Sequence, residues 1–316
     1  MSKDTVKKVK EAWDIVGEIK KHVTLTKKGQ NYVGLCPFHS EKTPSFYVSP
    51  AKKIFHCFGC GENGDVIAFM MKHENLSFKE VMVEKANEFQ IPHDFSSHSS
   101  NTNELDELRE FLNQLQIKYM AWFLENKNIQ AYCTKRALSQ ADIQTFGIGY
   151  AEKPKEQMAW VKSNQCEKLS IKSGLFKEDT YPLLMDRLIF PIHNSRGILV
   201  GFSGRTLDAE NKAKYINSPE SNIFSKKKLL YGLHLAKKKA KELDRLIIVE
   251  GYMDVIAMHQ HGIEETVAVM GTALTEFHAK ELSKYTKNII LMFDSDMAGQ
   301  TAVKKSLPAL QAEQLN

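Results

Sequence analysis

Two short motifs of metal-ligating residues near the start of the chain constrain its fold more than any other feature. The motifs are CPFH and CFGC, and each places two ligand-type side chains with two residues between them. Zn²⁺ takes four such ligands in a tetrahedron, and two tight turns that each supply a pair can provide them. Because four protein ligands leave no open position, we expect one structural zinc ion per chain. The predicted ligands are Cys36, His39, Cys57 and Cys60.

The residues around these motifs predict a small β-sheet. The runs NYVGL, SFYVS and KIFHC are rich in β-branched and aromatic residues, and PAKK between the last two is a turn signal. Together they predict a three-stranded zinc ribbon. His56 competes with His39 as a ligand, but on a strand it points away from its neighbour Cys57, so we favour His39.

The five cysteines are too few, and odd in number, for a disulfide framework. A redox-active Cys-x-x-Cys beside an unrelated Cys and His is the alternative interpretation of the motifs, which their paired spacing disfavours. Cys133 and Cys166 lie far from both motifs and are expected to be small buried side chains.

The predicted ribbon also carries lysines interleaved with aromatic residues. Cations beside aromatic faces suit single-stranded nucleic acid, because bases stack on the rings while phosphates meet the lysines. The alternative is that the rings form the core of this small domain. The residues are Lys42, Lys52, Lys53, Phe46, Tyr47, Phe55 and Phe58.

Length and charge indicate a globular protein of two or three domains. The chain has 316 residues, and its net charge of +5 permits a polyanionic partner without requiring one. No apolar run is long enough to span a bilayer, and the charged N-terminal stretch lacks the apolar core of a signal peptide. We therefore expect a cytoplasmic protein that has no membrane partner.

Local signals divide the chain into segments. Asp65 is a predicted helix N-cap, and the capping box Ser77–Glu80 begins a second helix. The stretch SSHSSNTNE predicts a flexible linker, and apolar spacing predicts helical structure over 104–132. The predicted domains are residues 1–95, 105–243 and 244–316, with the linker at 96–104.

Strands alternate with helices in the last segment, which predicts a parallel sheet. The strand-like runs RLIIVE, TVAVM and NIILMFD are each followed by a helical stretch. The carboxyl ends of parallel strands meet at one edge of a sheet, where ligands usually bind. Glu250 ends the first run, and Asp294 and Asp296 follow the third.

These carboxylates predict a site for a hard divalent cation, Mg²⁺ or Mn²⁺. Like charges repel unless a cation lies between them, and Mg²⁺ held by a few carboxylates keeps waters and meets substrate phosphates. Asp254, one helical turn after Glu250, can face the same cleft. Two simpler interpretations stay open, with Asp296 as an N-cap of the next helix and Glu250 as a surface strand end.

The order of the motifs resembles that of the bacterial DnaG-type DNA primases. The resemblance rests on CPFHSEKTPSF, HCFGCGENGD, YCTKRALS, GFSGRTL, AKYINSP, FSKKKLLYGL, VEGYMD and FDSDMAG. It implies an α+β multidomain fold with an N-terminal zinc ribbon and short helices, a mixed α/β subdomain of the primase core, and a partial TOPRIM parallel sheet.

The resemblance also implies an activity, which is the synthesis of short RNA primers for DNA replication. The implied partners are single-stranded DNA, which the ribbon would recognise, ribonucleoside triphosphates and the RNA primer. The catalytic residues would be Glu250, Asp294 and Asp296, with Asp254 as a further Mg²⁺ ligand. By motif match, the path of template and nucleotides would be lined by Arg136, Arg205, Lys214 and Lys226. Members of the family carry Gly where this chain has Ala137.

The end of the sequence departs from the family pattern. A TOPRIM core continues with a further strand and acidic pair, and full-length relatives add a domain that binds the replicative helicase, whereas this sequence ends at SLPALQAEQLN. We expect an incomplete TOPRIM unit with weak metal binding and weak priming. The alternative function is a weak or inactive primase that serves as a single-stranded-DNA-binding module. A TOPRIM nuclease or topoisomerase fits the ribbon and the KYINSP block less well.

Overall fold

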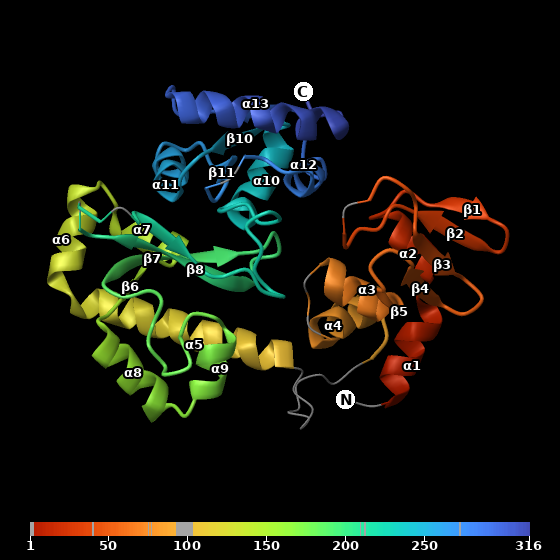
Figure 1. Ribbon diagram of the computed structural model, residues 1–316, viewed down its shortest axis with the longest axis horizontal. Helices are drawn as coiled ribbons and strands as arrows, with labels where there is room; N and C mark the ends of the chain where they lie inside the picture. Colours follow the sequence, from red (N-terminus) through yellow and green to blue (C-terminus); the bar gives the residue numbers. More distant parts are fainter. Residues whose placement is uncertain are drawn as a thin grey trace. The chain divides into compact units, whose positions relative to one another are not determined.

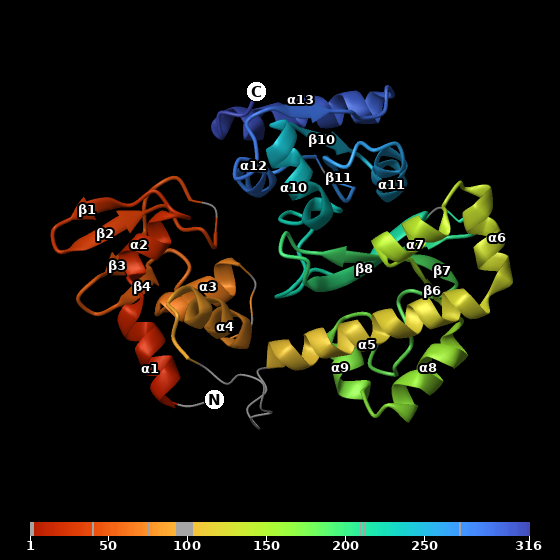
Figure 2. The same cartoon turned by 180° about the vertical axis from the view of Figure 1, so that it is seen from behind.

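In the computed structural model the chain folds into two compact units, Met1–Asp106 and Glu107–Asn316 (Figures 1 and 2). The predicted linker at 96–104 lies outside the described residues except for Glu104, and the predicted domain limits stay a prediction. The described residues are 3–39, 41–74, 76, 78–92, 104–208, 210–211, 213–271 and 273–316.

The first unit contains a five-stranded antiparallel sheet whose strands follow chain order. Its core is aromatic. The rings of Phe46 and Phe55 stack with 5.3 Å between their centroids, and Phe69 packs against both. The strands are β1 (Thr26–Lys28), β2 (Asn31–Gly34), β3 (Phe46–Ser49), β4 (Ile54–Cys57) and β5 (Asn63–Gly64).

The prediction of three strands was therefore wrong, because the sheet has two further outer strands, β1 and β5. The three predicted runs form β2, β3 and β4. All three residues of β1 are exposed, and β5 has only two residues. Neither strand shows the apolar alternation that a half-buried strand needs, so only pairing with a neighbour makes them strands.

Among the described residues of the first unit, four helices accompany the sheet. Asp65 caps α3 as predicted, because its side chain accepts a hydrogen bond of 2.9 Å from the N–H of Ala68. The predicted capping box before α4 depends on Ser77, which lies outside the described residues. The sequence analysis did not predict the two helices before the sheet. The helices are α1 (Lys3–Ala12), α2 (Ile15–Lys20), α3 (Val66–His73) and α4 (Phe78–Glu88).

The helical stretch predicted over 104–132 is divided into α5 (Glu104–Glu125) and α6 (Lys127–Lys135). The division falls at Asn126, whose side chain accepts hydrogen bonds from the N–H groups of Asn128 and Ile129 and so begins a new helix. Helix α5 is 22 residues long, yet neither it nor any other helix of the described residues is long and apolar enough to cross a membrane.

A four-stranded antiparallel sheet in the order β6-β7-β8-β9 forms the first half of the second unit. Helix α5 runs along this sheet (Figures 1 and 2), and Tyr119 packs edge-on against Phe202 of β8. The strands are β6 (Gly149–Ala151), β7 (Arg187–His193), β8 (Leu199–Thr206) and β9 (Tyr215–Asn217). The helices of this half are, besides α5 and α6, α7 (Gln140–Phe146), α8 (Pro154–Ser163) and α9 (Glu167–Lys172).

The predicted parallel sheet is confirmed in the second half, with strand order β11-β10-β12. Strand β10 is central and fully buried, and the helices cover an aliphatic core around it. Helix α13 lies along this small sheet in both views. The elements are α10 (Leu233–Leu243), β10 (Leu246–Val249), α11 (Tyr252–Gln260), β11 (Thr266–Ala268), α12 (Glu276–Leu282), β12 (Ile289–Leu291) and α13 (Met297–Ala312).

Ala137 has a left-handed backbone between α6 and α7, with φ of 57°. This conformation explains why the family pattern has Gly here, since a Cβ in the left-handed region costs roughly 1–2 kcal/mol. The carbonyl of Ala137 also accepts a hydrogen bond of 2.6 Å from Gln260 of α11, so the turn helps to join the two halves of the unit.

We predict that Ala137→Gly leaves the free energy of unfolding within about 1 kcal/mol of the original, because relief of the left-handed strain offsets the entropy cost of glycine. Ala131→Gly, inside α6, is the matched control and should lose about 1 kcal/mol. Urea denaturation of both variants is the measurement. An Ala137→Gly loss clearly larger than that of Ala131→Gly would contradict the prediction.

Candidate metal and nucleic-acid sites

The structure brings the four predicted zinc ligands together in the first unit. Their ligand atoms all lie within 4.8 Å of one another. The Sγ atoms of Cys36 and Cys60 are 3.8 Å apart, as are Cys57 Sγ and His39 Nδ1. A Zn–S bond of about 2.3 Å places sulfur atoms of a tetrahedron about 3.8 Å apart, so the geometry fits zinc. His56 is not in this group.

Glu41 supports these ligands and was missed by the sequence analysis. One of its oxygens accepts the Cys36 N–H at 2.7 Å, and the other lies 3.3 Å from His39 Nε2. His39 thus faces the thiols with Nδ1 and a carboxylate with Nε2, the arrangement that fixes the orientation of metal-ligating histidines. Gly59 is required beside it, because a Cβ there would lie 2.6 Å from His39 Nε2. In the sequence, the position of Glu41 two residues after His39, in CPFHSE, was the signal that could have revealed this supporting role.

The aromatic residues of the ribbon divide between core and surface. Phe46 and Phe55 are buried, as the core interpretation predicts. Phe58 is 71% exposed and packs edge-on against the partly exposed Tyr47. Lys28, which was not predicted, lies over the Tyr47 ring at 5.7 Å. The stacking surface available to a base is therefore smaller than the sequence suggested. The predicted lysines of this surface, Lys42, Lys52 and Lys53, are exposed.

Two of the residues predicted to be catalytic are in contact at the edge of the parallel sheet. Glu250 follows β10 and Asp294 lies shortly after β12, the strand paired with β10. The N–H of Asp294 donates a hydrogen bond of 2.8 Å to Glu250 Oε1. Asp296 accepts one of 2.8 Å from the Gly299 N–H and caps α13, so the N-cap interpretation holds for one of its oxygens.

Asp254 lies in the first turn of α11 and accepts a hydrogen bond of 3.0 Å from the Gly251 N–H. Partial desolvation raises the pKa of its carboxyl and the charge of Asp294 raises it further, while Lys214 and Arg205 oppose the shift. The side chains of Asp254 and Asp294 are therefore electrostatic neighbours. Within the described parts of the chain, however, no three acidic side chains converge as tightly as the cysteines do.

Arg205 connects the basic residues to this acidic edge. Its side chain is buried and donates hydrogen bonds to the hydroxyls of Tyr132, at 3.1 Å, and Tyr215, at 2.6 Å. Arg136 lies over the Tyr132 ring at 5.6 Å. The Tyr215 ring packs at 5.3 Å against Tyr252, the second residue after Glu250. These contacts therefore hold the antiparallel sheet of the second unit against the acidic edge of its parallel sheet.

The three tyrosines were missed, although each lies in a motif that the sequence analysis selected, YCTKR, KYINSP or VEGYMD. Lys214 is exposed and close enough to influence Asp254. Lys226 is anchored on a different element, since its carbonyl lies 3.1 Å from His278 Nε2 of α12. The structure thus connects Arg136, Arg205 and Lys214 with the acidic edge, and it fixes the backbone of Lys226 to α12.

Three family models match successive parts of the chain. Residues 1–101 match the CHC2 zinc finger, residues 95–237 match the N-terminal domain of the DNA primase catalytic core, and residues 244–316 match the Toprim domain. The four Cys/His ligands fall in the first match and the carboxylates in the third.

Similar proteins are DNA primases. The DNA primase of Clostridium acetobutylicum is 40% identical over 98% of this chain and that of Thermotoga maritima 38% over 99%, and the chain covers 53% and 56% of them. The chain thus spans about half the length of these curated relatives. The crystal structure of the zinc-binding and RNA polymerase domains of the Aquifex aeolicus primase matches all of the chain, with 35% identity, TM-score 0.64 and 78% of that structure covered. A DnaG primase catalytic domain bound to single-stranded DNA matches 66% of the chain, with 34% identity, TM-score 0.60 and 70% of that structure covered.

Gly299 allows α13 to approach the acidic edge. A Cβ at this position would lie 2.1 Å from the Asp294 carbonyl oxygen and 2.8 Å from Glu250 Oε1. Replacing Gly by Ala within a helix normally stabilises by about 1 kcal/mol. At position 299 the close contact with the backbone makes the substitution destabilising instead. We predict that Gly299→Ala lowers the free energy of unfolding by roughly 1–3 kcal/mol through overpacking.

The matched control for this prediction is Ala298→Gly, in the same helical turn, which should cost about 1 kcal/mol through helix propensity alone. Denaturant unfolding measures both variants, and Mn²⁺ binding reports on the carboxylates. Only Gly299→Ala should weaken Mn²⁺ binding. A stabilising Gly299→Ala would refute the close approach.

Proposed function

The chain belongs to the bacterial DnaG-type DNA primases, and from that premise we propose that it synthesises RNA primers on single-stranded DNA in the cytoplasm. The single observation that carries this proposal is the edge of the parallel sheet, where Glu250 and Asp294 meet and Asp254 has two basic neighbours, Lys214 and Arg205. Nucleotidyl transfer requires carboxylates that bind a divalent metal ion and, beside them, basic side chains that bind phosphate.

We infer that Mg²⁺ or Mn²⁺ is held by Glu250, Asp254, Asp294 and Asp296. The donor set fits, because hard cations prefer carboxylate oxygens and retain waters. Glu250, Asp254 and Asp296 each use one oxygen in a backbone hydrogen bond that fixes the loop, and the other oxygen can face the cation. When bound, the cation would supply Lewis-acid stabilisation of the phosphoryl oxygens.

The basic residues would position the nucleic acid and the incoming ribonucleotide. Arg205 cannot move freely, since two tyrosine hydroxyls hold its guanidinium, so we assign it a phosphate-orienting role at short range. Exposed Lys214 and Arg136 and half-buried Lys226 would contact the phosphates of the template or nucleotide. A non-catalytic DNA-binding module is not favoured, because such a module has no need for grouped carboxylates beside the lysine.

In the first unit we propose a zinc ion held by Cys36, His39, Cys57 and Cys60, with a structural role. The exposed Phe58 and its neighbour Tyr47 would then form the surface that meets the template, because exposed rings stack with unpaired bases.

In the second unit, primer synthesis and DNA binding should depend on different residues, which point mutations can test one at a time. We predict that Glu250→Gln, which keeps the acceptor for the Asp294 N–H, reduces incorporation of labelled ribonucleotides on single-stranded DNA by about a thousandfold, since several kcal/mol of cation stabilisation is lost. Affinity for DNA should hardly change. Lys214→Ala should instead weaken DNA binding and lower its salt slope by roughly one unit.

Each of these variants serves as the control for the other. Mn²⁺ binding, followed by electron paramagnetic resonance, should decrease in Glu250→Gln and persist in Lys214→Ala. Primer synthesis that survives Glu250→Gln would exclude this acidic edge as the catalytic site. If the original sequence synthesises no primers while both variants behave as expected in binding, the binding-module alternative regains support.

Zinc removal should affect the first unit alone. We predict that Cys57→Ser loses the ribbon zinc and the fold of the sheet around it, because metal binding and folding are coupled at such sites. The second unit should still unfold cooperatively at its usual denaturant concentration. Elemental analysis together with urea unfolding tests both parts, and a Cys57→Ser protein with full zinc content would rule out the ligand assignment.

A further inference from the structure

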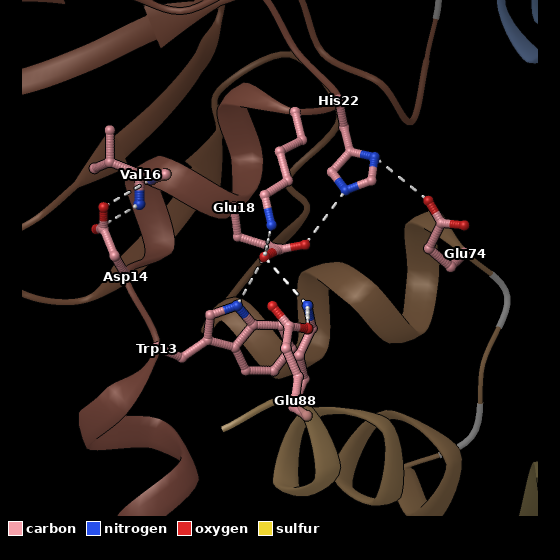
Figure 3. A network of polar contacts seen from close by, with 10 residues as sticks. Trp13, Asp14, Val16, Glu18, His22, Glu74 and Glu88 are labelled. Carbon is pink, nitrogen blue, oxygen red and sulfur yellow. Dashed lines mark hydrogen bonds and ion pairs between the residues drawn. The ribbon is translucent and has the colours of Figure 1, made fainter. Parts of the chain in front are cut away.

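A second group of metal-ligating side chains lies in the first unit, apart from the zinc ligands. His22 follows the C-cap of α2, His73 is the last residue of α3, and Glu74 is the C-cap of α3. Their ligand atoms all lie within 4.8 Å of one another. Figure 3 shows His22 between two carboxylates, Glu74 on one side and Glu18 on the other.

The distances in this group suit a small divalent cation. Glu74 Oε1 lies 2.9 Å from His73 Nδ1 and 3.4 Å from His22 Nδ1, and the two imidazole centroids are 4.5 Å apart. Bonds of about 2.0–2.1 Å in a tetrahedron place ligand atoms about 3.3 Å apart. The three side chains are only 13–14% exposed, so they are already held in place by the surrounding packing.

The environment of His22 points to a missing ligand. Both ring nitrogens are buried, and neither has a hydrogen-bond partner among the residues that the structure describes. A neutral imidazole has one donor and one acceptor, and buried polar atoms are nearly always satisfied. A cation on Nδ1 would use the acceptor and leave the Nε2 proton directed at Glu18, whose Oε1 is 3.6 Å away.

Glu18 is built to play that supporting role. The same carboxylate accepts hydrogen bonds from Trp13 Nε1 at 3.0 Å (Figure 3), and from Lys21 Nζ at 3.0 Å and Lys85 Nζ at 3.3 Å. These three donors hold the Glu18 carboxylate in one orientation, with its other oxygen toward His22. An ionised, fixed carboxylate behind a histidine sets the tautomer and raises the basicity of the metal-facing nitrogen.

We propose that His22, His73 and Glu74 form a second metal site, which binds Zn²⁺ through two imidazoles and one carboxylate and has a fourth position open to water. Two histidines and one glutamate form an established zinc ligand set of this kind. Because two ligands come from the end of α3 and one from the segment after α2, the ion would tie these helices together. The site contains no thiolate, which distinguishes it chemically from the ribbon.

The first experiment is a zinc count on the intact chain. The protein is equilibrated with excess Zn²⁺, desalted, and analysed for zinc per chain. We expect two equivalents in the original sequence and one in Glu74→Gln and in His73→Gln. The matched control is Glu88→Gln, which alters a carboxylate bound to Lys85 in the same network but not a ligand, and it should keep two.

The second experiment uses Co²⁺ as a spectroscopic probe on protein whose ribbon is already loaded with zinc. Binding at the proposed site should give the visible bands of a nitrogen and oxygen site without the near-ultraviolet sulfur charge-transfer band. Glu74→Gln should weaken Co²⁺ binding at least tenfold, the lower end of what loss of even an outer-shell partner costs a metal site. The retained ribbon zinc shows that the variant is folded.

The results decide between a metal site and a cluster of ion pairs. A single zinc equivalent in the original sequence, with no Co²⁺ spectrum, would establish that the histidines only pair with Glu18 and Glu74. A second equivalent that persists in both Glu74→Gln and His73→Gln would place the bound ion elsewhere. Either result overturns the proposal without bearing on primer synthesis.

Discussion

The parallel pairing of β10 with β12 is the constraint on which the acidic edge of the second unit depends. Glu250 and Asp294 are 44 residues apart, and only this pairing lets the N–H of one meet the carboxylate of the other. The close approach of α13 at Gly299 then holds the edge in place. Because the carboxylates lie at strand ends rather than inside the sheet, Asp294 is exposed and Glu250 half-buried while the aliphatic core lies behind them, as the proposed cation site requires.

Aromatic packing connects this acidic edge with the antiparallel sheet of the second unit. Tyr252 begins α11 directly behind the acidic edge, and it packs at 5.5 Å against Phe190 and at 5.3 Å against Tyr215 of the antiparallel sheet. Tyr215 in turn holds Arg205. Neutral hydroxyls position the Arg205 guanidinium without neutralising its positive charge, so the charge remains available to attract a phosphate. A carboxylate partner would neutralise most of that charge. The phosphate-binding role proposed for Arg205 is consistent with this environment.

The first unit combines its apolar core with local clusters of metal-ligand and charged side chains. Besides its buried apolar residues, the unit is held together by four metal-ligand side chains, by the packed rings of Phe46, Phe55 and Phe69, and by a buried network around Glu18. The proposed second cation would act on the helices as the ribbon zinc acts on the sheet. The unit would then be held at two places rather than one.

The sequence by itself determined what is local. Ligand pairs with two residues between them, the Asp65 cap and the alternation of strands and helices are set by neighbours along the chain, and the structure contains each of them. Only the tertiary structure decided what depends on distant partners. The strands β1 and β5 exist because neighbours pair with them, and Tyr132 and Tyr215 matter because Arg205 lies between them. Spacing along a chain encodes local geometry, but contacts between residues dozens of positions apart arise only when the chain is packed.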